Sequence, residues 1–245
     1  MSKVLERELE GLREQLISQF TVVEQMTQLS VRSLVERRPE FAERVIESDA
    51  AVDATDIRIE EECLKLLALH QPVAFDMRWL ICVIKVNGEI ARMADTACNI
   101  AERSKALFQF PEFTVPDELS EMVDGSLRMV RRSLDSFVTC DSKMANDVIE
   151  MDDIVDSLNR VVIDKLHDIM RSNPDLVEAA VNCFSASRLL EQIADIATSF
   201  AEEVIYLVEG EIVRHQHDAR PNASGANAAT SSSADAFKSN AVSTS

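Results

Sequence analysis

An internal repeat is the sequence feature that most limits how this chain can fold. The segment VIESDAAVD at residues 45–53 returns as VIEMDDIVD at residues 148–156. A second segment, IARMADTACNIAE at residues 90–102, returns as LEQIADIATSFAE at residues 190–202. Because both segments recur in the same order, about 100 residues later, the chain is predicted to fold as two similar halves.

The composition and periodicity of each half predict long helices. Only 5 glycines and 6 prolines occur in 245 residues, too few for the many turns of a β or α/β protein. Apolar residues recur at helical spacing; in the first half, Val45, Val52, Ile59 and Leu66 stand seven residues apart. Prolines and breaks in this periodicity place six predicted helices at about residues 4–36, 39–70, 74–108, 117–140, 143–170 and 174–215.

The predicted fold class is therefore all-α: two tandem, pseudo-symmetric three-helix bundles made of six long helices, with a disordered C-terminal tail. Residues 1–110 form the first bundle and residues 118–217 the second, joined by a proline-containing linker at residues 111–117. Residues 218–245 contain almost no bulky apolar side chains, so burial cannot offset the entropy of ordering them. This last segment is the predicted tail.

The formal net charge of −18 limits the classes of partner. Nucleic acids and anionic membranes attract basic surfaces, so we expect no nucleic-acid binding, and membrane contact only peripherally through partner proteins. Cations and basic protein patches are the expected ligands. The five cysteines, an odd number without CxxC spacing, are interpreted as buried free thiols in a reducing compartment. Since no run approaches the roughly 18 apolar residues of a membrane span, a cytoplasmic location is predicted.

Acidic pairs within the repeat are the candidate metal ligands. In each copy two aspartates stand four residues apart, so they project from one face of a helix. The third helix of each half adds further polar side chains. A cluster of oxygen ligands suits Mg²⁺, Mn²⁺, Ca²⁺ or iron and disfavours zinc. The predicted second-half site comprises Asp152, Asp156, Glu191 and Asp195, and the weaker first-half site comprises Asp49, Asp53, Asp95 and Asn99.

The two predicted sites differ at one position. Ala91 stands in the first half where Glu191 stands in the second, so the second half is predicted to be the better site for iron, manganese or magnesium. The alternative interpretation is an ordinary surface network. In that case Arg188, Gln192 and Lys165 neutralise the acids or form hydrogen bonds with them.

No motif specifies a catalytic nucleophile. The chain lacks a Gly-rich phosphate loop, a GxSxG motif and a cysteine with an evident histidine partner. The single DKLH segment at residues 164–167 falls short of the two ExxH pairs of di-iron bundles. We therefore predict a protein that is not an enzyme. Two alternatives stay open: a carboxylate-bridged metalloenzyme whose cation activates water or oxygen, and a metal-dependent membrane-surface protein.

Several segments together resemble the PhoU family. These are the two VIExD…D copies, LLALHQPVAFDMRW at residues 66–79, IARMADTACNIAE, and LEQIADIATSFAEEVIYLVEGEIVRH, and the similarity spans about residues 3–215. The resemblance implies two similar three-helix bundles, usually in a homodimer, and in some members iron or other metal clusters bound by E/DxxxD motifs. It also implies a negative regulator of phosphate uptake and of the phosphate-starvation response. Such a regulator contacts the ATPase subunit of the phosphate ABC transporter and the phosphate sensor histidine kinase.

Carried over by position, the family's metal motif falls on the eight residues named above, with departures. The third helix of a family half often reads LERIGDHAxNIAE. Relative to this pattern, Ala91 removes one acid from the first half, whereas Gln192 replaces an arginine, Ile196 a histidine and Ser199 an asparagine in the second. The resemblance therefore implies metal binding more strongly in the second half.

Overall fold

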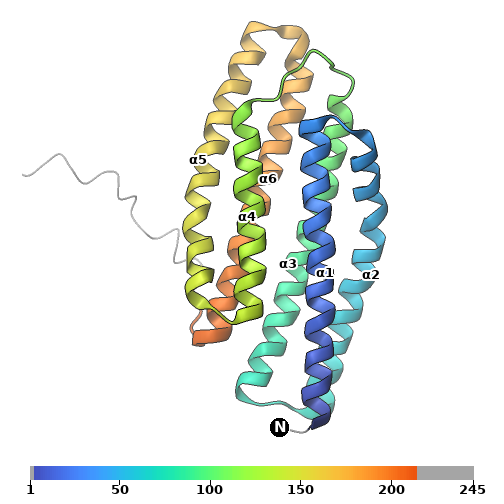
Figure 1. Ribbon diagram of the computed structural model, residues 1–245, viewed down its shortest axis with the longest axis vertical. Coiled ribbons are helices and arrows are strands. Elements are labelled where there is room, and N and C mark those ends of the chain that lie inside the picture. The colour runs from blue at the N-terminus through green and yellow to red at the C-terminus, as the bar shows by residue number, and fades with distance from the viewer. Residues whose placement is uncertain (1–2, 214–245) are drawn as a thin grey trace, which may run out of the picture. The chain divides into compact units, whose positions relative to one another are not determined.

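Helices make up all the regular secondary structure of residues 3–213, the part of the chain that the computed structural model describes. This confirms the predicted all-α class with six long helices. The elements are α1 (Lys3–Glu36), α2 (Pro39–His70), α3 (Ala74–Leu107), α4 (Asp117–Thr139), α5 (Ser142–Ser172), the 3₁₀ turn η1 (Pro174–Leu176) and α6 (Val177–Glu209) (Figure 1).

Prolines and capping side chains set several helix starts close to their predicted positions. Pro39 occupies the first turn of α2, where its missing N–H removes no helical hydrogen bond. The Asp141 carboxylate caps α5 by accepting a hydrogen bond from the Met144 backbone N–H at 3.0 Å. The Asn173 side chain accepts from the Asp175 backbone N–H at 3.1 Å and caps η1, so a 3₁₀ turn precedes α6.

The last helix ends earlier than its periodicity predicts. α6 ends at Glu209 and not near residue 215, and Gly210 follows it with a φ of 79°. Glycine adopts this left-handed conformation without steric cost, and its N–H bonds to the Tyr206 carbonyl at 2.9 Å. The predicted tail at residues 218–245 lies outside the described residues, and the predicted bundle boundaries stay predictions.

Each half is a group of three mutually packed helices, and the halves meet mainly along α3 and α6. α1, α2 and α3 pack together, as do α4, α5 and α6 (Figure 1). The segment between α3 and α4 is anchored to the α1–α2 turn. The Arg37 guanidinium donates to the carbonyl oxygens of Phe110, at 2.9 Å, and of Phe113, whose side chain is buried. The connection between α3 and α4 is therefore packed against the helices.

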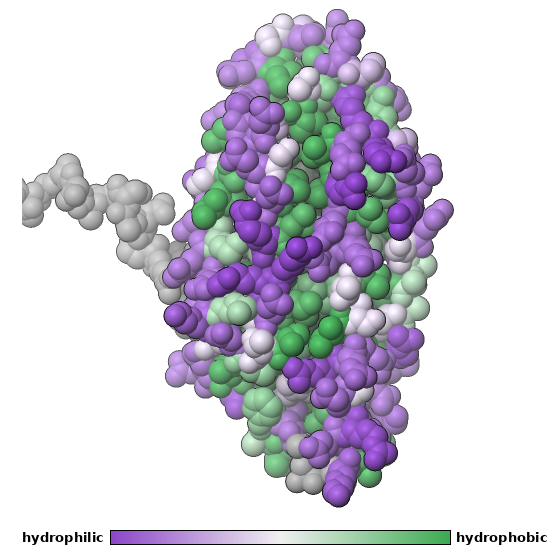
Figure 2. All heavy atoms as spheres, viewed as in Figure 1, coloured by the Kyte–Doolittle hydropathy of each residue, from purple (hydrophilic) through white to green (hydrophobic). Residues whose placement is uncertain are grey.

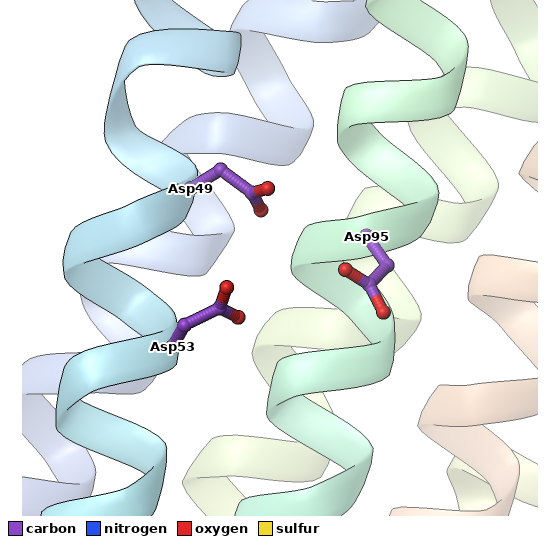
Figure 3. Close-up of side chains that lie close together, drawn as sticks. All are labelled: Asp49, Asp53 and Asp95. Atoms are coloured by element: carbon purple, nitrogen blue, oxygen red, sulfur yellow. The ribbon is translucent and has the colours of Figure 1, made fainter.

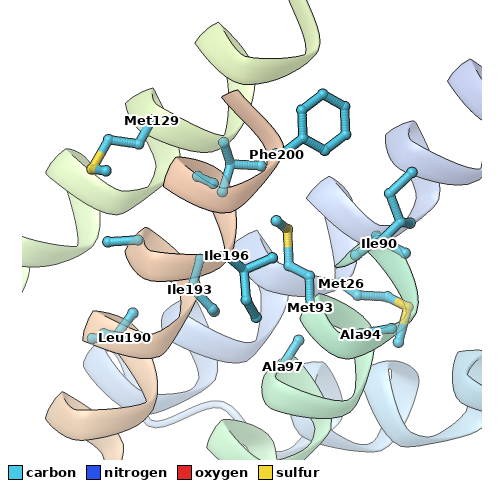
Figure 4. Close-up of a cluster of buried hydrophobic side chains, with 14 of the residues drawn as sticks. Met26, Ile90, Met93, Ala94, Ala97, Met129, Leu190, Ile193, Ile196 and Phe200 are labelled. Atoms are coloured by element: carbon cyan, nitrogen blue, oxygen red, sulfur yellow. The ribbon is translucent and has the colours of Figure 1, made fainter. Parts of the chain in front are cut away.

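The seam between α3 and α6 belongs to the centre of the core. Its buried cluster includes small α3 residues such as Ala97 together with Ile196 and Phe200 of α6 (Figure 4). The Phe200 ring packs edge-on against Phe20 of α1 and Phe137 of α4, with centroid distances of 5.3 and 5.9 Å. Ile196, aligned above with a histidine of the family pattern, is fully buried. It contributes to packing between the halves.

The exposed surface is mixed in character. Polar and charged side chains cover much of the face shown in Figure 2, with apolar patches between them. Large apolar side chains are also exposed around the α2–α3 turn, among them Leu69, Val73 and Phe75. Within residues 3–213, none of the helices combines the length and the apolar composition that a membrane span requires.

Candidate functional site

Three aspartates of the first half converge between α2 and α3. Asp49 and Asp53 project from successive turns of α2 toward α3, and Asp95 faces them from α3 (Figure 3). One carboxylate oxygen of each residue lies within 4.8 Å of the others. The spacing of four residues puts the α2 pair on one helix face, and the packing of α3 against α2 adds the third carboxylate.

The charge of this group is not compensated by an ion pair in the part of the chain that the structure describes. Partial desolvation between the packed helices raises the pKa of Asp95, and the charges of Asp49 and Asp53 raise it further. The Asp95 side chain nevertheless remains exposed to solvent. The Cys98 thiol donates a hydrogen bond to Asp49 Oδ1 at 3.4 Å. Burial, followed by the charge of Asp49, raises the pKa of Cys98 to about 12, so it is a protonated donor to the group at neutral pH.

Four acids of the second half lie near one another but converge less tightly. Desolvation raises the pKa of Asp152 to about 7, with further contributions from Asp195, Asp156 and other neighbouring carboxylates. The pKa of Asp195 is also raised, by desolvation first and then by Glu191 and Asp156. One carboxylate oxygen of Asp152 is buried without a hydrogen-bond partner among the described residues. These side chains therefore repel one another across the α5–α6 interface.

Part of the difference between the halves comes from a neighbouring arginine. The Arg188 guanidinium forms an ion pair with Glu191, one turn away on α6. Lys165 pairs with Glu118 instead of joining these acids. Within residues 3–213, only the first-half aspartates bring three ligand atoms within 4.8 Å of one another. The tighter group thus lies in the half that the sequence ranks second, and the ranking for metal binding stays a prediction.

The sequence motifs miss a groove that opens between α3 and α6. Its lining includes Arg92 and Arg103 of α3 and Arg188 of α6. Asn99, which the sequence assigns to the first-half metal site, lines this groove, and so does Asp195. The intervals of seven and four residues from Arg92 through Asn99 to Arg103 indicate one helix face. That spacing predicts a polar face on α3, but it does not predict that Arg188 of α6 lies beside this face.

Comparison with known proteins decides the family. A family model described as the PhoU domain matches residues 16–104 and matches again at residues 119–204. The chain belongs to the PhoU family. The two matches fall on α1–α3 and on α4–α6, so each three-helix half carries one PhoU domain. The recognition based on the sequence repeat is confirmed.

Relatives of this chain include proteins from Aquifex aeolicus and Pseudomonas aeruginosa. A "Phosphate-specific transport system accessory protein PhoU homolog" of Aquifex aeolicus is 36% identical over 86% of this chain and 96% of its own length. A protein of the same name from Pseudomonas aeruginosa is 32% identical over 88% of this chain and 89% of its own length. These names describe accessory proteins and not enzymes, in agreement with the prediction for this chain.

Solved structures share the fold. The crystal structure of PhoU from Pseudomonas aeruginosa matches with a TM-score of 0.80 at 31% identity, covering 84% of this chain and 99% of that one. The phosphate transport system regulatory protein PhoU from Streptococcus pneumoniae matches with a TM-score of 0.79 at 24% identity, covering 85% and 99%. At 24% identity, the match to the Streptococcus pneumoniae structure supports a shared fold and no more.

Proposed function

We propose that this protein is a cytoplasmic accessory regulator of phosphate transport that acts as a homodimer. It represses phosphate uptake and the phosphate-starvation response by contacting the ATPase subunit of the phosphate ABC transporter and the phosphate sensor histidine kinase. The observation that carries this proposal is the pair of PhoU domains spanning most of the described chain. The net charge of −18 supports protein partners with basic patches over nucleic acid.

Deletion of the gene tests this role. Without the protein, a phosphate-starvation reporter is expected to stay switched on in high-phosphate medium, because the repressing contacts are lost. Reporter output and phosphate uptake are measured in the deletion strain and in the same strain re-expressing the chain. Output that stays low in the deletion strain would contradict the proposal.

We also propose that the regulator depends on a metal cation held between α2 and α3. Asp49, Asp53 and Asp95 place three carboxylate oxygens within 4.8 Å, and none has a basic partner among the described residues. Carboxylates without nitrogen or thiolate ligands suit iron, manganese or magnesium. A cation there offsets the mutual repulsion of the three side chains and ties α2 to α3.

Metal removal is expected to lower the melting temperature of the wild-type protein, because a ligand that binds only the folded state stabilises it. Asp95→Asn is expected to lose most of the bound metal and most of this chelator-dependent shift, whereas the matched second-half variant Asp152→Asn retains both. Metal content is measured by mass spectrometry on protein purified without a histidine tag. Metal loss confined to Asp152→Asn would instead place the site in the second half, as the sequence motif ranks it.

A further inference from the structure

The groove between α3 and α6 concentrates arginines on an otherwise acidic protein. It is open to solvent and measures about 610 Å³, within the size range of small-molecule sites. The two helices run in opposite directions (Figure 1), which brings residues 92–103 of α3 beside residues 184–195 of α6. The lining holds three arginines and two acids, an excess of one positive charge on a chain that carries −18. Such a reversal of charge in a concave site favours an anionic ligand.

The arginines of this groove are available to a ligand. Arg103 forms no ion pair with any residue of the described chain. Arg92 pairs with Glu89 at 2.7 Å and Arg188 pairs with Glu191, each within one helical turn and each with 53% of the arginine side chain exposed. Ion pairs between residues three apart on a helix surface contribute little to stability, so a multiply charged anion can replace Glu89 and Glu191 as partners of these arginines.

Further hydrogen-bond donors lie between the arginines. Asn99 stands four residues before Arg103 on α3, and Gln192 stands four residues after Arg188 on α6. Neither amide makes a side-chain hydrogen bond within the described part of the chain. Each helix therefore offers an arginine and an amide from one face. Phe184 adds an apolar surface beside this polar lining.

We propose that the α3–α6 groove binds an anion carrying a phosphate group, through Arg92, Arg103 and Arg188. The planar guanidinium group donates two parallel hydrogen bonds to phosphate oxygens, and several arginines can share one phosphate because it offers more acceptors than a carboxylate. The bound anion is either free inorganic phosphate or a nucleoside diphosphate, and the base of such a nucleotide would contact the Phe184 side chain. Anion binding is measured on purified protein and the regulatory role in cells. A negative binding result can therefore be distinguished from a failure of the proposed cellular role.

Titration calorimetry on the chelator-treated full chain tests the groove, because removing metal prevents a cation from bridging phosphate to the acids. Inorganic phosphate and ADP are titrated separately, with acetate as a third anion. Arg103→Ala is expected to weaken phosphate binding about tenfold, as the loss of one charge-assisted contact predicts, and Arg103→Lys less. The matched control is Arg128→Ala. Arg128 lines a different groove, between α1 and α4, and likewise forms no ion pair with a described residue.

Binding that Arg103→Ala weakens and Arg128→Ala preserves supports the site. Tight binding of ADP with weak binding of phosphate identifies the nucleotide as the ligand, and equal affinities identify the phosphate group alone. Three results would overturn the proposal: no saturable binding of either anion up to about 10 mM, equal weakening by both variants, or acetate binding as tightly as phosphate. Circular dichroism confirms that each variant keeps its helices.

Discussion

Phe200→Ala is expected to lower the free energy of unfolding by about 3 to 5 kcal/mol. Phe200 is fully buried, and its ring contacts Phe20 of α1 and Phe137 of α4 edge-on. Truncation removes this buried apolar area and leaves a cavity where α6 meets one helix from each half. Both terms act in the same direction, because a packed core relaxes only partly around a void.

Urea and thermal unfolding followed by circular dichroism measure this effect, and the melting temperature is expected to fall by about 10 °C. Phe75→Ala is the matched control, because Phe75 is 49% exposed at the start of α3. Its expected change lies within about 0.5 kcal/mol. If the two variants unfold alike, Phe200 does not join the halves as the structure indicates.

Asp152→Asn is expected to stabilise the chelator-treated protein by about 2 kcal/mol at pH 8 and to change little near pH 4. Desolvation and the carboxylates of Asp195, Asp156, Asp153 and Glu191 raise the pKa of Asp152 from 3.8 to about 7 in the folded protein. Between these values the folded state binds more protons than the unfolded chain. Stability contributed by this group is therefore present below pH 4 and falls as pH rises toward 7.

Urea unfolding from pH 4 to pH 8 measures this dependence, and the variant should show a flatter profile than the wild type. Asp153→Asn is the control, because it removes the same charge from an exposed neighbouring position on α5. It is expected to reduce the slope between pH 4 and pH 7 only slightly, because Asp153 raises the pKa of Asp152 less than desolvation, Asp195 and Asp156 do. A wild-type slope retained in Asp152→Asn would show that this carboxyl is not the titrating group.

Helix positions could be predicted from the sequence wherever a local backbone rule applies. Pro39 begins α2, Pro72 follows its end, and Pro116 precedes α4, because proline restricts its own backbone and that of the residue before it. The predicted end of α6 near residue 215 is wrong, because helical periodicity alone gives no weight to Gly210. The left-handed φ of this glycine ends the helix.

The candidate site could be predicted only in part. The spacing of Asp49 and Asp53 predicts their common helix face, and the structure places both there. The distance from this pair to Asp95 depends on how α3 is rotated against α2. The Arg188–Glu191 ion pair has a local spacing of three residues and agrees with the surface-network interpretation, whereas Lys165 pairs with Glu118 of α4.

The sequence by itself determined the helical class, the duplication and the family, because helix periodicity, proline rules and repeated motifs are local properties of the chain. The tertiary structure alone decided which carboxylates converge and that Arg92, Arg103 and Arg188 line one groove. The distance between charged side chains on different helices depends on how those helices are rotated and on the angle at which they cross. That rotation is set by packing at the buried α3–α6 seam and the other helix interfaces, which involve residues distant in sequence.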